Sequence, residues 1–284
     1  MYDASGRDRV SIHAWTSMFR ELWQFRELIQ RFVSRNFAAQ FRLSFLGYLW
    51  VAFPPIATTV VFALLRQAQI VNVPMPEHGM PYAIFALVGT TIWGFFTQVT
   101  LMATGSIAGA GSLVSKIYFP REVLVLSTVG NALINVVIRF GVVLLSFALF
   151  LYVPHWQIVF LPLVLLPVVA LGVGLGLFFA PINTMMHDMG RALEFAFQFG
   201  MFLAPTVYPT PDLETATGHW QQILYWMHVL NPVSHFMYAA NDLIQYGTFH
   251  LTNGFIVSSV ASLLILMLGW RFFHICEPLL AERL

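Results

Sequence analysis

The charged residues Lys116, Arg121 and Glu122 lie close together between two long apolar stretches. Lys116 is the only lysine among 284 residues, and its surroundings read SKIYFPRE. Ammonium, guanidinium and carboxylate groups at this spacing form ion pairs and charge-assisted hydrogen bonds. Because only 10% of the residues are charged, we expect this segment to present its charges to another polypeptide.

A second set of polar residues lies inside an apolar stretch. Asn131, Asn135 and Arg139 follow one another at steps of four, which places them on one face of a helix. A charge inside a membrane span is costly unless it faces protein or water, so we expect this intramembrane polar stripe to point inward. Interhelical hydrogen bonding at a subunit contact and direct contact with a substrate both remain open as its role.

Aromatic side chains gather in two apolar segments. Their rings stack on the apolar faces of sugar rings, which would suit a carbohydrate path, although Trp and Tyr also collect at membrane interfaces. The candidates for a translocation path are Tyr48, Trp50, Phe53, Phe199, Phe202 and Tyr208.

Motifs for enzymatic chemistry are weak. Several His and acidic residues follow residue 150, and an outward-facing metal or acid-base site is one reading of them: His155, His219, His228, His235, His250, Asp212, Glu214 and Asp242. Neither HExxH nor GxSxG occurs. A phosphate-binding P-loop requires glycine before its lysine, and Ser115 stands there. Any ATP hydrolysis would therefore belong to a separate subunit, and we expect no cofactor in this chain.

The elements that must position these residues are membrane helices. With 58% hydrophobic residues, the chain is far more apolar than a soluble domain. We predict an all-α membrane protein with spans at 46–65, 82–102, 123–153, 156–182, 195–208 and 255–273. One lysine and no basic stripe give no support to nucleic-acid binding.

The positions of the arginines predict how the chain is oriented in the membrane. Seven arginines precede the first span, and cytoplasmic loops keep such residues. Counting six crossings from a cytoplasmic N-terminus leaves both termini in the cytoplasm. The segment 208–254 lacks Arg and Lys and should face outward, whereas Arg66, at the outer end of the first span, is accommodated by snorkelling.

Two further segments have distinct patterns. Met18, Leu22, Phe25, Ile29 and Phe32 recur at helical spacing opposite a polar face, which predicts an amphipathic helix on the inner membrane surface, against a partner protein, or both. Two half-length apolar pieces at 220–230 and 233–246 flank Asn231-Pro232. We expect a cytoplasmic N-terminal region at 1–44, which carries the amphipathic helix, and a six-helix transmembrane domain at 45–284. Within that domain, a re-entrant helical hairpin is expected over about 209–246.

Three segments resemble one family. The sequence FRLSFLGYLW at 41–50, followed by Pro54, resembles the first span of membrane subunits in ABC-2 type polysaccharide exporters. SLVSKIYFPRE at 112–122 resembles the loop after their second span, and LNPVS at 230–234 resembles the element before their last span. The resemblance covers nearly the whole chain, and its most specific part is 116–122.

The resemblance implies a homodimer of this chain with two copies of a separate ABC ATPase, which uses ATP and Mg²⁺, in the cytoplasmic membrane. The substrate would be a lipid-linked polysaccharide such as O-antigen, passing a pore flanked by the first and fifth spans. An ABC-2 exporter of a drug or simple lipid, and an intramembrane enzyme acting on lipid-linked sugar, are the alternatives. In that family, short cytoplasmic segments contact the ATPase. The resemblance therefore implies that the ATPase-coupling residues of this chain are Lys116, Arg121, Glu122, Asp188, Arg191 and Glu194.

Overall fold

Helices are the only regular secondary structure in the described part of the chain. A computed structural model describes residues 20, 22–40, 42, 44–71, 73, 79–110, 119–186, 188–211, 218–249 and 251–283. The helices, with η marking 3-10 turns, are α2 (Arg26–Gln40), α3 (Leu49–Gln67), α4 (Tyr82–Gly105), η3 (Ala108–Ala110), α6 (Glu122–Leu149), η4 (Trp156–Phe160), α7 (Leu161–Met185), α8 (Asp188–Gly200), η5 (Met201–Leu203), α9 (His219–Leu230), α10 (Pro232–Gln245) and α11 (Asn253–Arg283).

Within these residues, five helical segments are long and apolar enough to cross a bilayer: Leu49–Gln67, Tyr82–Gly105, Glu122–Leu149, Trp156–Met185 and Asn253–Glu277. They correspond to five of the six predicted spans, so the chain is a multi-pass membrane protein. Boundaries differ by a few residues. For example, α3 begins at Leu49 rather than at residue 46, because the backbone N–H of Gly47 donates to Ser44 Oγ at 3.0 Å in a preceding turn.

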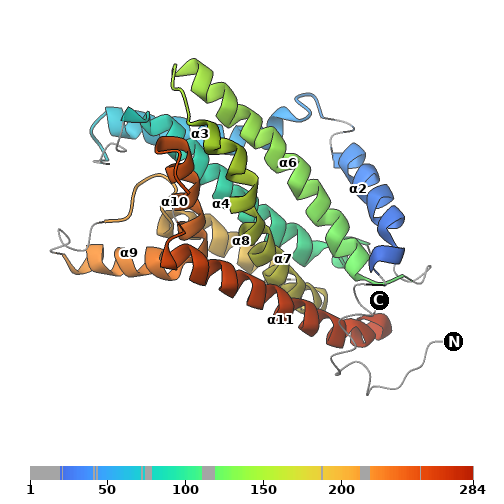
Figure 1. Cartoon of the computed structure of the whole chain (residues 1–284). Coiled ribbons are helices and arrows are strands. Elements are labelled where there is room, and N and C mark those ends of the chain that lie inside the picture. Colours follow the sequence, from blue (N-terminus) through green and yellow to red (C-terminus); the bar gives the residue numbers. More distant parts are fainter. Residues whose placement is uncertain are drawn as a thin grey trace.

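Helix α4 lies at the centre of the bundle, in contact with α3, α6, α7, α8 and α10 (Figure 1). Nearly all of its side chains are buried in the main core, which explains why it is apolar all round. Helices α7 and α11 cross closely at Gly174 and Gly269, where an added Cβ would collide with the facing backbone. Small residues thus allow the close helix packing typical of membrane bundles.

Helix α2 lies beside the first half of α6 (Figure 1). Phe32, Leu28 and Ile29 of α2, together with Leu22 and Phe25 just before it, pack on Phe119, Val123 and Leu124. Arg20, Gln24, Glu27, Arg31 and Arg35 remain exposed on the opposite face. The predicted amphipathic pattern is therefore confirmed from residue 22 onward, with α6 covering much of the apolar face.

The segment predicted as the span 195–208 has a different shape. Its helix α8 begins earlier, at Asp188, and covers 13 residues before the 3-10 turn η5. Ala204 then adopts φ −126° and ψ 153°, the extended conformation favoured before a proline, and Pro205 follows. Helix α8 is too short to cross a bilayer by itself.

The two half-length pieces form the helices α9 and α10, joined at Asn231 and Pro232 as the sequence pattern indicates. Asn231 caps α10 by accepting from the N–H of Val233 at 3.0 Å. Helix α10 is buried against α4, α7, α11 and η4. In contrast, α9 exposes large apolar side chains, among them Trp220 and Leu230.

Candidate functional site

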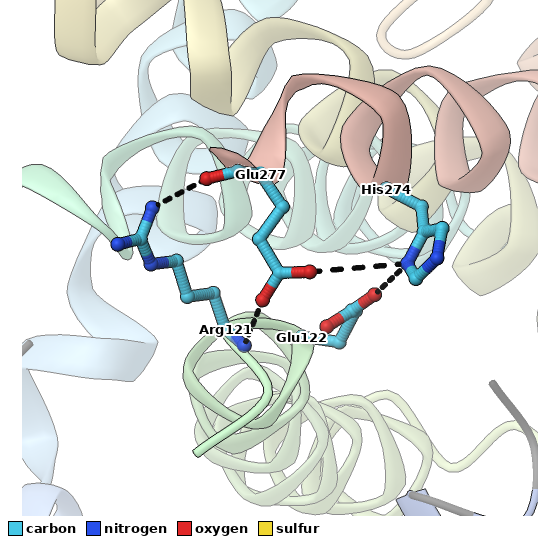
Figure 2. Close-up of polar contacts among 4 residues, drawn as sticks. All are labelled: Arg121, Glu122, His274 and Glu277. Atoms are coloured by element: carbon cyan, nitrogen blue, oxygen red, sulfur yellow. Dashed lines mark hydrogen bonds and ion pairs between the residues drawn. The ribbon is translucent and has the colours of Figure 1, made fainter. Parts of the chain in front are cut away.

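Four charged or ionisable side chains from two distant parts of the sequence meet at one end of the bundle (Figure 2). We call Arg121, Glu122, His274 and Glu277 the inner network. Nδ1 of His274 lies 3.2 Å from Oε1 of Glu122 and 3.9 Å from Oε2 of Glu277. The backbone N–H of Arg121 donates to Oε1 of Glu277 at 3.4 Å, and Nη1 of Arg121 donates to the Glu277 carbonyl at 2.8 Å.

Helix ends explain part of this arrangement. Arg121 precedes the first residue of α6, so its N–H points out of the helix and needs an external acceptor. A carboxylate near that end also interacts favourably with the helix dipole, which suits both Glu122 and Glu277. The inner network therefore connects the start of α6 to the C-terminal part of α11.

The inner network also has the composition of a metal ligand set. One ligand atom each from Glu122, His274 and Glu277 lies within 4.8 Å of the others, and carboxylates with imidazole suit divalent metals. However, these groups already contact one another without an ion: Nδ1 of His274 lies near both carboxylates, and the backbone N–H of Arg121 donates to Glu277. The arrangement supports a connection between α6 and α11 without requiring an ion.

The predicted ATPase-coupling residues fall into three groups. Lys116 lies outside the described residues. Arg121 and Glu122 are only 8% and 5% exposed and face α11. The third group, Asp188, Arg191 and Glu194, belongs to the first two turns of α8 and not to a loop. The side chains of Asp188 and Arg191 are 94% and 85% exposed and form an (i, i+3) ion pair at 3.7 Å.

The start of α8 is fixed by a residue of α7. Oδ1 of Asn183 accepts from the backbone N–H of Gly190 at 2.8 Å, and Nδ2 of Asn183 donates to the carbonyl of Thr104 at 3.4 Å. Asn183 thus caps α8 and links it to the end of α4. The exposed charges of α8 consequently stand on a rigid support.

The aromatic candidates are largely exposed. Tyr48, Trp50, Phe53, Phe199 and Phe202 are all classed among the exposed large side chains, and Tyr208 is half-buried. Phe202 of η5 lies 6.1 Å from Phe62 of α3, centroid to centroid. Helix α8 packs on α4 through Phe197, whose carbonyl accepts from Nε1 of Trp93 at 3.1 Å. The exposed rings therefore follow two segments that flank α4.

The intramembrane polar stripe points into the bundle. Asn131 and Asn135 are buried, and the amide of Asn135 has no hydrogen-bond partner within the described part of the chain. Arg139 is half-buried, and its Nε donates to the carbonyl of Val51 in α3 at 3.2 Å. Of the three stripe residues, Arg139 thus connects α6 to α3.

The histidines of the last third do not form a common site among the described residues. His228 is buried, with Nδ1 2.7 Å from Thr210 Oγ1 and its ring stacked on Tyr208. His235 instead contacts the carbonyl of Val229 at 3.0 Å through Nε2. Burial lowers the pKa of His228 to about 4 and raises the pKa of Tyr238, which hydrogen-bonds Thr210. The imidazole of His228 is therefore neutral at physiological pH.

Comparison with known proteins gives the family. Residues 27–244 match the family described as ABC-2 type transporter. This chain belongs to the ABC-2 type transporter family. Three similar proteins are each called O-antigen export system permease protein RfbA. One, from Myxococcus xanthus, is 28% identical over 69% of this chain and 74% of its own length. Two from Klebsiella pneumoniae are 21% and 20% identical, covering 78% and 88% of this chain and 82% and 95% of their own lengths.

Membership in the ABC-2 family means that the chain is the membrane component of a transporter rather than an enzyme, and that it works with an ABC ATPase. The matched region spans α2 to α10. Sequence reasoning missed His274 and Glu277, because the predicted last span ends at residue 273. Their spacing of three on one helix face was the available signal, but Arg121 and Glu277 are 156 positions apart.

Proposed function

We propose that this chain is the transmembrane subunit of an ATP-driven exporter that moves a lipid-linked polysaccharide of the O-antigen type across the cytoplasmic membrane. The observation that carries the proposal is the shared name of the three relatives, each aligned over 74–95% of its own length. The exposed aromatic rings on α3, α8 and η5 are consistent with a sugar-binding surface.

The proposed topology has six crossings. Arg121 and Glu277 meet, so the start of α6 and the C-terminal part of α11 share one end of the bundle. Asn183 contacts Thr104, so α7 ends beside the end of α4. Tyr152, just after α6, donates to the Ile244 carbonyl at 3.4 Å, which places α10 at the opposite end. The chain must therefore travel from one end to the other between α7 and α10.

Helix α8, η5 and the turn residues after them make this sixth crossing in our proposal. Thirteen α-helical and three 3-10 residues span about 25 Å, and the turn residues that follow η5 supply the remainder of a core that is about 30 Å thick. The backbone of that last part is covered by protein, since Tyr82 Oη donates to the Val207 carbonyl at 2.7 Å. An even number of crossings puts both termini on the same side, and the seven arginines before the first span favour the cytoplasmic side. Helices α9 and α10 then form the outer hairpin.

The proposed coupling to ATP hydrolysis uses two kinds of residue. Lys116 and the exposed Asp188, Arg191 and Glu194 contact the ATPase directly. Arg121 and Glu122 act indirectly, because their contacts with α11 hold the end of the 112–122 loop in place. The ATPase brings ATP and Mg²⁺, and this chain contributes no cofactor site.

The proposed assembly is a homodimer of this chain with two ATPase subunits, and the aromatic faces of α3, α8 and η5 line the path between protomers. The testing experiment expresses the chain with its partner ATPase in a strain that lacks its own O-antigen exporter. Appearance of polymer at the cell surface, dependent on both subunits, supports the proposal. Normal dimer and ATPase assembly without polymer export, but with transport of another amphiphile, would reject it.

A further inference from the structure

We propose that Arg139 is a positioning residue for the translocation path, an inference that rests on the proposed function. Arg139 holds the first turns of α3, and with them Trp50 and Phe53, through a hydrogen bond to the main-chain carbonyl of Val51. The sequence of α3 removes the usual helical donors to this carbonyl.

Two consecutive prolines lie inside α3, at positions 54 and 55. In an α-helix the carbonyl of Val51 accepts from the N–H of residue 55, and in a 3-10 turn from the N–H of residue 54. Proline has no N–H, so both donors are missing. Val51 is buried, and an unsatisfied carbonyl inside a membrane protein is costly. The sequence of α3 therefore demands a donor from elsewhere.

Arg139 supplies that donor from α6. Its Nε lies 3.2 Å from the carbonyl oxygen of Val51. Its Nη1 lies beside Gly94 of α4, where an added Cβ would be only 2.8 Å away. Three helices thus meet at one guanidinium, and the absence of a side chain at position 94 leaves the room that it occupies.

The bond fixes the direction of the aromatic residues. Val51 and Ala52 are 7% and 3% exposed and face the bundle, whereas Trp50 and Phe53 are 51% and 55% exposed. The aromatic rings therefore lie on the outward side of the same turn that Arg139 holds from within. Another contact near this end of α3 is made by Tyr48, whose ring stacks on Phe37 of α2 at a centroid distance of 5.2 Å.

The proposal predicts suppression by a change in the backbone. In Arg139→Met the Val51 carbonyl loses its donor, and we expect export per folded protein to fall about tenfold, the usual scale for one hydrogen bond to a charged group. Pro55→Ala returns an N–H four residues after Val51. The double variant Arg139→Met/Pro55→Ala should therefore recover most of the lost export, and Pro55→Ala alone should stay near wild type.

Pro54→Ala is the matched control. It makes the same substitution one position earlier, where in α-helical geometry the new N–H points to the carbonyl of Trp50 instead. Arg139→Met/Pro54→Ala should recover clearly less than the Pro55→Ala double variant. Arg139→Lys keeps a long cationic donor and should retain more export than Arg139→Met.

A readout independent of transport separates this inference from the proposed function. In a Cys276→Ser background, Leu49→Cys places a thiol on the exposed start of α3, and maleimide labelling of folded, solubilised protein reports the position of that turn. We expect Arg139→Met to change the labelling rate by about threefold or more, because it shifts the population of positions that the first turn of α3 adopts. Adding Pro55→Ala to Arg139→Met should return the labelling rate to that of wild type. Equal labelling in all variants, or failure of Pro55→Ala to restore either readout, overturns the positioning role. Restored labelling without polymer export by wild type would reject the proposed function alone.

Discussion

Nδ1 of His274 lies 3.2 Å from Oε1 of Glu122, and this contact joins the start of α6 to the last helix of the chain (Figure 2). Glu122 follows Lys116 by six positions in the sequence. Because α11 is 31 residues long, about 46 Å at 1.5 Å per residue, it exceeds the thickness of a bilayer core. The contact therefore ties the start of α6 to a helix that is long enough to reach from one membrane surface to the other.

The inner network should stabilise the fold cooperatively. We expect Glu122→Gln and His274→Gln each to lower the free energy of unfolding, and a double-mutant cycle to give a coupling energy of about 1–3 kcal/mol. Thermal unfolding of the solubilised protein measures both quantities. The matched control is the exposed pair of Asp188 and Arg191, where solvent screening leaves little net energy. Strictly additive effects of Glu122→Gln and His274→Gln would show that the two side chains do not depend on each other.

The exposed charges of α8 should act on the ATPase rather than on folding. We expect Arg191→Glu to reduce stimulation of the ATPase about fivefold or more, since charge reversal at an interface rim acts on association and rate. The melting temperature should remain unchanged, because the Arg191 side chain is 85% exposed. Gln222→Glu, which adds a negative charge on α9, is the control and should leave ATPase stimulation intact. Normal ATPase stimulation by Arg191→Glu would remove α8 from the coupling interface.

The aromatic residues of α3 should serve transport more than stability. Trp50→Ala and Phe53→Ala each remove a half-exposed ring, so we expect export to fall about tenfold while the free energy of unfolding changes by less than about 1 kcal/mol. Polymer export and thermal unfolding are measured on the same variants. Val137→Ala, which shortens a 70% exposed side chain of α6, should alter neither. Loss of stability with normal export would instead assign the two rings to packing.

Elements governed by local chemistry were predictable from the sequence. The break between α9 and α10 follows from Pro232, which biases Asn231 away from helix. The apolar face of α2 follows from its 3.6-residue period, although the sequence could not say that α6 covers it. In both cases the signal lies within a few consecutive residues.

Features that depend on tertiary contacts were not predictable. The early start of α8 relies on Asn183, which caps Gly190. The inner network joins residues more than 150 positions apart. Arg139 was placed on an inward-facing stripe by its spacing, but its partner is a carbonyl that only the prolines of α3 make available. Hydropathy alone also could not show that the helix of the fifth predicted span ends before Pro205.

The buried His228 should make stability depend on pH. Burial lowers the pKa of His228 to about 4, whereas an unfolded histidine titrates near 6.5. Between these values the unfolded state binds a proton that the folded state excludes, so stability is complete above about pH 6.5 and falls as the pH drops toward 4.

The test compares melting temperatures of wild type and His228→Asn from pH 7.5 to 4.5. His228→Asn removes the titrating group, and we expect its melting temperature to fall less than that of wild type over this window. At the acid end, the pH-dependent loss in the free energy of unfolding should be about 3 kcal/mol larger for wild type than for His228→Asn, at 1.4 kcal/mol per unit of pKa. His219→Asn is the control, because His219 is exposed and its replacement should leave the pH profile of wild type unchanged. Parallel profiles for wild type and His228→Asn would mean that the imidazole of His228 is accessible to protons in the folded protein.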